Sequence, residues 1–134
     1  MTTRAAGTFE VKITPQSADE HTDGAPIGRL TIDKQFRGDI EGTSKGVMLA
    51  AQGTVKGSAA YSAMERVTAT LAGQAGTFVL QHTGIMDRGT PSLVITVVPD
   101  SGTDALEGLS GTMAIDIANG KHSYTFDYTI PSPP

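Results

Sequence analysis

Glu65 and His82 are the two side chains best suited to acid–base chemistry in this sequence. Glu65 has the same parity as Tyr61, Ala63 and Val67. Residues of one parity lie on one face of an extended strand, so Glu65 falls on an otherwise apolar face. An unpaired carboxylate in an apolar interior is costly and tends to bind a proton or find a partner. We therefore expect Glu65 to have a polar partner.

His82 is the partner that we expect, because two of the hairpin turns open to this sequence place it beside Glu65. A two-residue turn at Gly73-Gln74 would pair Glu65 directly with His82. A four-residue loop from Gly73 to Gly76 would leave the two residues diagonal on the same face, still within side-chain reach. A three-residue loop would separate their faces and remains a third alternative.

The Glu65–His82 pair has a functional and a structural interpretation. In the functional one, these two are the candidate catalytic residues, an acid/base pair in a pocket where Tyr61, Tyr124 and Tyr128 donate hydrogen bonds. The same five residues are then the candidate ligand-binding residues. In the structural one, the pair fixes strand register, and structural pairs also perturb pKa values. We give the structural interpretation somewhat greater weight.

Other polar groups carry weaker signals. His82, His122 and Glu65 have ligand types that suit zinc or iron, but no sequence spacing supports such a site, so we predict no metal and no cofactor. His122 is expected to cap a barrel end, and His21 to be a solvated loop residue. The segment 101–104 lacks the contexts of a phosphate loop or a nucleophile elbow and is predicted to be an ordinary turn.

The composition limits the classes of protein. The chain has 134 residues, which suits one domain over 1–134. It has no cysteine, which excludes disulfides and thiolate metal sites. The net charge is −4 and the sequence contains no basic run, so we expect neither nucleic acid nor a membrane as partner. Without a signal-peptide pattern, the expected compartment is the cytoplasm. The proline-rich residues 131–134 are expected to fray.

Apolar and polar residues alternate with a period of two over most of the chain, which predicts eight strands. A short helix would also suit the propensities of residues 61–67, but their alternation favours a strand. A loop is predicted at 16–25, and the glycines at 38, 42 and 46 are expected to mark the turn before the third strand. The strands are expected at about 9–13, 30–36, 47–54, 59–71, 77–83, 92–98, 109–117 and 122–130.

Asn119-Gly120 is the strongest turn signal, because both residues tolerate the positive φ of a two-residue type I′ hairpin. Counting outward from this turn places Ile117 opposite His122 and Ile115 opposite Tyr124, which sorts apolar side chains onto one face. The connections between strands are short and sequential. We therefore predict an all-β fold, a single eight-stranded antiparallel barrel whose closure removes exposed edges.

Several short stretches together carry a resemblance to a known family: Phe36–Ser44, Tyr61 with Glu65, Gly76–His82, Ser101–Thr103 with Leu106, and His122–Tyr124. The chain resembles the bacterial domain-of-unknown-function family 3224, which is similar in fold to plant allene oxide cyclase, an eight-stranded barrel of the wider lipocalin-like group. The resemblance covers nearly the whole chain and implies a barrel, but it implies no reaction, and no catalytic residue carries over from the cyclase.

Three functions follow as hypotheses. The first is a barrel that binds a small hydrophobic or amphipathic molecule inside, near Glu65 and His82. The second is a cyclase- or isomerase-like enzyme that uses these two residues for proton transfer, and the third is a structural barrel that acts through its outer surface. We also expect a homodimer, because Val79, Val94 and Val98 fall on the outward parity and leave the outer face partly apolar.

Overall fold

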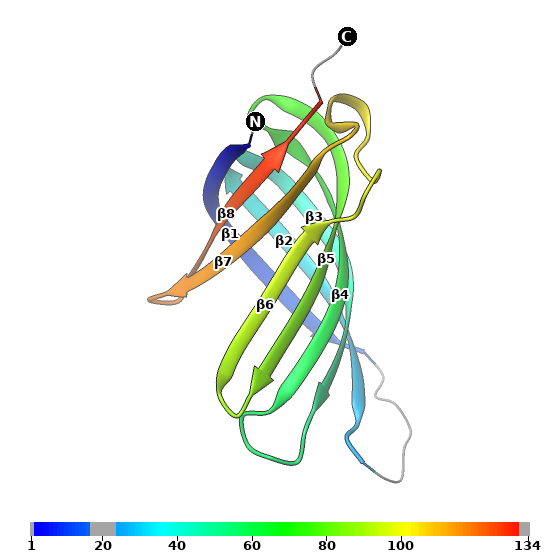
Figure 1. Cartoon of the computed structure of the whole chain (residues 1–134), viewed down its shortest axis with the longest axis vertical. Helices are drawn as coiled ribbons and strands as arrows, with labels where there is room; N and C mark the ends of the chain where they lie inside the picture. The colour runs from blue at the N-terminus through cyan, green and yellow to red at the C-terminus, as the bar shows by residue number, and fades with distance from the viewer. Residues whose placement is uncertain (1, 17–23, 132–134) are drawn as a thin grey trace.

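The computed structural model describes residues 2–16 and 24–131, in which eight antiparallel strands close into one barrel (Figure 1). Strand order follows chain order, and β1 closes the barrel by pairing with β8. The predicted fold is confirmed. The predicted loop at 16–25, His21 and the tail at 131–134 lie wholly or largely outside the described residues. The strands are β1 (Thr3–Pro15), β2 (Ile27–Gly38), β3 (Ile40–Gln52), β4 (Ala59–Leu71), β5 (Gln74–Asp87), β6 (Thr90–Val97), β7 (Ser110–Ala118) and β8 (Lys121–Thr129).

The predicted start of the third strand is wrong, because β3 begins at Ile40 and includes Gly42 and Gly46. These glycines mark close contact between strands and not a turn. A β-carbon on Gly42 would lie 2.6 Å from the β-carbon of Ala69, its partner on β4. A β-carbon on Gly46 would lie 2.9 Å from the α-carbon of its partner Glu65. Glycine thus lets β3 approach β4 closely beside the buried carboxylate.

The β7–β8 hairpin has the register that its turn predicts. Asn119 and Gly120 have φ values of 53° and 77°, as a type I′ turn requires. Ile117 pairs with His122, and Ile115 pairs with Tyr124.

The β4–β5 hairpin differs from both turns that brought Glu65 and His82 together in the sequence analysis. Ala72 and Gly73 form a two-residue turn in which both residues have positive φ. Glu65 therefore lies opposite Leu80, and Ala63 lies opposite His82. This register changes the partners but keeps the parity, so Glu65 and His82 still share the inner face.

One end of the barrel is closed by the segment between β6 and β7. It contains the 3-10 helix η1 (Asp104–Leu106), whose Leu106 is fully buried. The Ser101 hydroxyl accepts a hydrogen bond from the Val79 amide at 3.0 Å, and the Thr103 hydroxyl accepts one from the Thr77 amide at 2.9 Å. The polar residues of segment 101–104 thus attach this cover to β5.

The other end of the barrel is open, because β6 and β7 pair only at Ile95–Met113 and Thr96–Thr112. The first half of β6 separates from β7 below this point (Figure 1). Meanwhile β5 and β6 remain paired down to Asp87 and Thr90. The strands β2 to β6 therefore form a curved sheet whose inner face is uncovered at this end.

Candidate functional site

Glu65 is fully buried at the centre of a polar network inside the barrel. Its Oε1 accepts hydrogen bonds from Lys34 Nζ at 3.1 Å and from His82 Nε2 at 2.7 Å. Its Oε2 accepts a hydrogen bond from the hydroxyl of Ser44. The partners come from β2, β3 and β5, so the carboxylate joins four neighbouring strands.

Two opposing effects set the pKa of Glu65. Burial raises it, but the hydrogen bond from His82, the charge of Lys34 and the hydrogen bond from Ser44 together outweigh burial and lower the pKa from 4.5 to about 2. Glu65 is therefore ionised at neutral pH. The ammonium of Lys34 balances its charge and also lies 4.8 Å from the centre of the Phe9 ring.

His82 links Glu65 to Tyr61. The Tyr61 hydroxyl lies 3.3 Å from His82 Nδ1. Tyr61 is half-buried, whereas His82 and Glu65 are buried. Burial and the nearby charge of Glu65 raise the pKa of the Tyr61 phenol, so it stays protonated at neutral pH. The network thus runs from a buried carboxylate to a phenol nearer the open end.

Lys34 and Ser44 are members of the network that the sequence analysis missed. Lys34 has the same parity as Ile32 and Phe36, so the alternation of β2 already places it on the inner face. A cation on that face was a usable signal for the partner of Glu65. Ser44 carried no such signal, because its segment was assigned to a turn.

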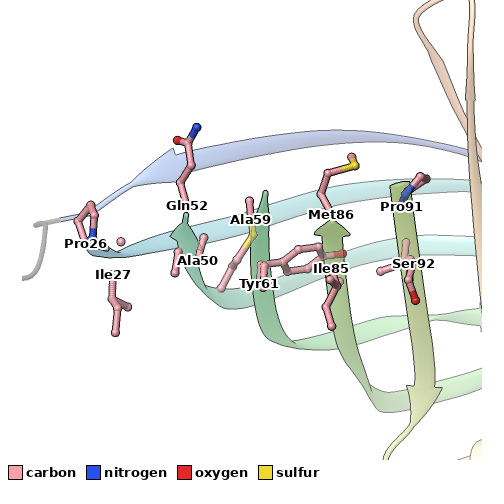
Figure 2. Close-up of a pocket in the computed structure, with 16 residues that line it drawn as sticks. Pro26, Ile27, Ala50, Gln52, Ala59, Tyr61, Ile85, Met86, Pro91 and Ser92 are labelled. Carbon is pink, nitrogen blue, oxygen red and sulfur yellow. The ribbon is translucent and has the colours of Figure 1, made fainter. Parts of the chain in front are cut away.

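An apolar pocket of about 690 Å³ occupies the open end of the barrel (Figure 2). Tyr61 and Gln52 provide inward polar side chains, and most of the lining is apolar. The lining residues are Pro26, Ile27, Gly28, Met48, Ala50, Ala51, Gln52, Ala59, Ala60, Tyr61, Gly84, Ile85, Met86, Pro91, Ser92 and Leu93.

Strand register places this pocket on the same face as the buried network. Two rows of inward residues cross the sheet there. Figure 2 shows two of these inward residues, Gln52 and Met86, on the side of the strands opposite to Ile27 and Ile85. Tyr61 belongs to both the pocket and the network. The inward rows are Gly28, Ala50, Tyr61, Gly84 and Leu93, followed toward the rim by Gln52, Ala59, Met86 and Pro91.

The structure brings three of the five candidate residues together, Tyr61, His82 and Glu65, and places Tyr124 and Tyr128 elsewhere. The Tyr124 hydroxyl accepts a hydrogen bond from the Ile40 amide at 2.8 Å and lies 3.2 Å from the Arg37 carbonyl oxygen. Its pKa is raised, with burial as the largest cause. Tyr128 stacks on Phe126 with ring centres 5.4 Å apart.

The histidines do not combine into a metal site in the part of the chain that is described. The His122 ring packs on Phe9 with centres 5.1 Å apart, away from His82. Among residues 2–16 and 24–131, no three His, Cys, Asp or Glu side chains are close enough to hold an ion. The described part also lacks a helix long and apolar enough to cross a membrane.

Fold and site together define a class: a small closed antiparallel barrel with an ionised hydrogen-bond network beneath an apolar pocket. The chain belongs to the DUF3224 family, "Protein of unknown function (DUF3224)", whose sequence model matches residues 5–128. It is similar to the crystal structure of a DUF3224 protein of unknown function from Shewanella oneidensis MR-1. Identity is 46%, the TM-score is 0.92, and the match covers 98% of this chain and 100% of the other. No curated protein matches the chain.

Proposed function

We propose that this protein binds a small hydrophobic or amphipathic molecule in the pocket at the open end of the barrel. The observation that carries this proposal is the pocket of about 690 Å³, whose wall is mainly apolar and includes the network residue Tyr61. Ligand sites in proteins typically combine an apolar wall with a few placed polar groups. An apolar chain along β3 to β6 with a polar end near Tyr61 fits this arrangement.

Binding can be tested with the neutral fluorescent probe N-phenyl-1-naphthylamine. Ala50 lies in an inward row of the pocket, so Ala50→Phe fills the space and should abolish the fluorescence increase. Leu49 is the next residue on the same strand, faces outward and is 50% exposed, so Leu49→Phe is the matched control and should bind the probe like the wild type. Equal binding by both variants, or none by the wild type, would contradict the proposal.

A second candidate function is an isomerase- or cyclase-like proton transfer, which the chain of contacts from Tyr61 through His82 to Glu65 favours. Glu65 is enclosed by its partners, so the group that would exchange a proton with a bound molecule is Tyr61, backed by His82. Glu65 would act as a positioning residue. The test is to measure incorporation of deuterium from the solvent into carbonyl compounds that bind to the protein. Incorporation that is lost in Tyr61→Phe but kept in Tyr128→Phe would support this function.

We also propose a homodimer formed through the outer face of the curved sheet. Val47, Leu49, Met64 and Val94 are exposed and lie on the outward parity of β3, β4 and β6. Burial of such a face against a second copy would remove apolar area from water. Sedimentation equilibrium should give the mass of a dimer, which Leu49→Lys would reduce to that of a monomer.

A further inference from the structure

The direction of the hydrogen bonds in the buried network determines which kind of polar group on a ligand can bind in the pocket. Lys34 Nζ can only donate, and it lies 3.1 Å from Glu65 Oε1. The Ser44 hydroxyl donates a hydrogen bond to Glu65 Oε2. An ionised carboxylate accepts hydrogen bonds and donates none, so His82 Nε2, at 2.7 Å from Oε1, must carry a proton.

Lys34 already balances the charge of Glu65, so a second cation at His82 would be unpaired in the buried network. The proton on Nε2 therefore assigns the tautomer of a neutral His82. A neutral imidazole has one protonated nitrogen and one acceptor nitrogen. Because Nε2 donates to Glu65, Nδ1 is the acceptor. The Tyr61 hydroxyl lies 3.3 Å from Nδ1, so it donates its proton to His82. Its oxygen then keeps only acceptor capacity for any other group.

We propose that the pocket selects ligands whose polar end donates a hydrogen bond, such as aliphatic alcohols, over ligands whose polar end only accepts one, such as esters and carboxylates. This inference rests on the proposed function and names the class of ligand for the same pocket. Tyr61 lines the pocket, and its oxygen presents an acceptor to a ligand. A carboxylate placed there would face the lone pairs of the Tyr61 oxygen. It would also lose its hydration on entering apolar surroundings, which is costly for a charged group.

The pocket can be tested by displacement of N-phenyl-1-naphthylamine with 1-decanol, methyl decanoate and decanoate. Decanol and the ester are both uncharged, so comparing them separates hydrogen-bond direction from charge. One net hydrogen bond changes an equilibrium constant by about fivefold, so the ratio of decanol affinity to ester affinity should fall by about fivefold in Tyr61→Phe. Tyr128→Phe is the matched control, because Tyr128 lies outside the pocket lining, and it should keep the wild-type ratio.

The tautomer can be measured without any ligand. Two-bond ¹H–¹⁵N correlation spectra of the wild type should show His82 protonated on Nε2, with an unprotonated Nδ1. Protonation of Nδ1, alone or together with Nε2, would overturn the inference and leave the proposed function intact. A ratio unchanged in Tyr61→Phe, or stronger binding of the ester or of decanoate, would overturn it as well. Absence of probe binding to the wild type would overturn the proposed function, and the inference with it.

Discussion

Gly84 lies directly opposite Tyr61 in the β4–β5 ladder, and the tyrosine ring occupies the space that a side chain at position 84 would need. A β-carbon on Gly84 would lie 2.3 Å from Tyr61 Cε1 and 2.7 Å from Cδ1. Real β-carbons do not approach other atoms so closely, because packed atoms keep van der Waals separation. Because position 84 has no side chain, the Tyr61 ring can lie flat against β5, where its hydroxyl reaches His82.

Gly84→Ala should displace the Tyr61 ring into the pocket. We expect loss of the Tyr61–His82 hydrogen bond, with a decrease of about 1 kcal/mol in the free energy of unfolding, and weaker binding of N-phenyl-1-naphthylamine. Gly28→Ala is the matched control for stability, because a β-carbon there would lie 4.0 Å from its nearest neighbour, the Ala50 carbonyl oxygen. Urea unfolding of both variants and probe titration of Gly84→Ala check this, and a Gly84→Ala variant that is as stable as Gly28→Ala would contradict it.

The depressed pKa of Glu65 predicts a loss of stability in acid. A carboxyl whose pKa is lower in the folded state than in the unfolded state adds stability above its unfolded pKa, and this stability disappears as the pH falls through the folded pKa. For Glu65 the window runs from 4.5 down to about 2. At about 1.4 kcal/mol for each pH unit, the contribution at neutral pH is about 3 kcal/mol.

Urea unfolding of the wild type and Glu65→Gln at a series of pH values measures this contribution. Glutamine keeps the shape of the side chain but cannot ionise, so the wild type should be the more stable protein at pH 7. The difference between the two free energies of unfolding should shrink as the pH falls below 4.5. A difference that is constant across this window would show that the ionisation of Glu65 does not stabilise the fold.

Lys34→Met should be strongly destabilising at neutral pH, because it leaves the buried carboxylate of Glu65 without its counter-ion. Removing one partner of a buried ion pair costs about 3 kcal/mol or more. The pKa of Glu65 should rise in this variant, so the cost should decrease as the pH is lowered and Glu65 binds a proton. The double variant Lys34→Met with Glu65→Gln should be more stable than the sum of the two single effects predicts, as a double-mutant cycle would show.

Local patterns in the sequence predicted much of the fold, while the pocket depended on contacts that no local pattern reveals. Alternation gave β4 its bounds, and Asn119-Gly120 gave the β7–β8 hairpin its register. Lys34 could have been found from its parity on β2. The open end could not be predicted, because it arises where the pairing of β6 and β7 stops, beyond the pair Ile95–Met113. That separation depends on side-chain packing between strands and on the length of the loop that connects them.

The β4–β5 turn was missed for a different reason, which its backbone conformation explains. Sequence patterns for type I′ turns favour Asn or Asp before Gly, and this turn has alanine in that position. Ala72 has a φ of 49°, close to the 53° of Asn119 in the other hairpin. A residue with a β-carbon is strained in this left-handed region, by roughly 1–2 kcal/mol, whereas asparagine visits it more readily.

Exchanging the residues at the two turns should therefore have opposite effects on stability. Ala72→Asn should raise the free energy of unfolding by about 1 kcal/mol, and Asn119→Ala should lower it by a similar amount. Ala72 and Asn119 are both exposed and have similar φ values, so each variant serves as the control for the other. Neither residue lines the pocket, so probe binding should be unchanged in both. Urea unfolding at neutral pH measures the effects, and a shift of the two midpoints in the same direction would contradict the assignment of strain to Ala72.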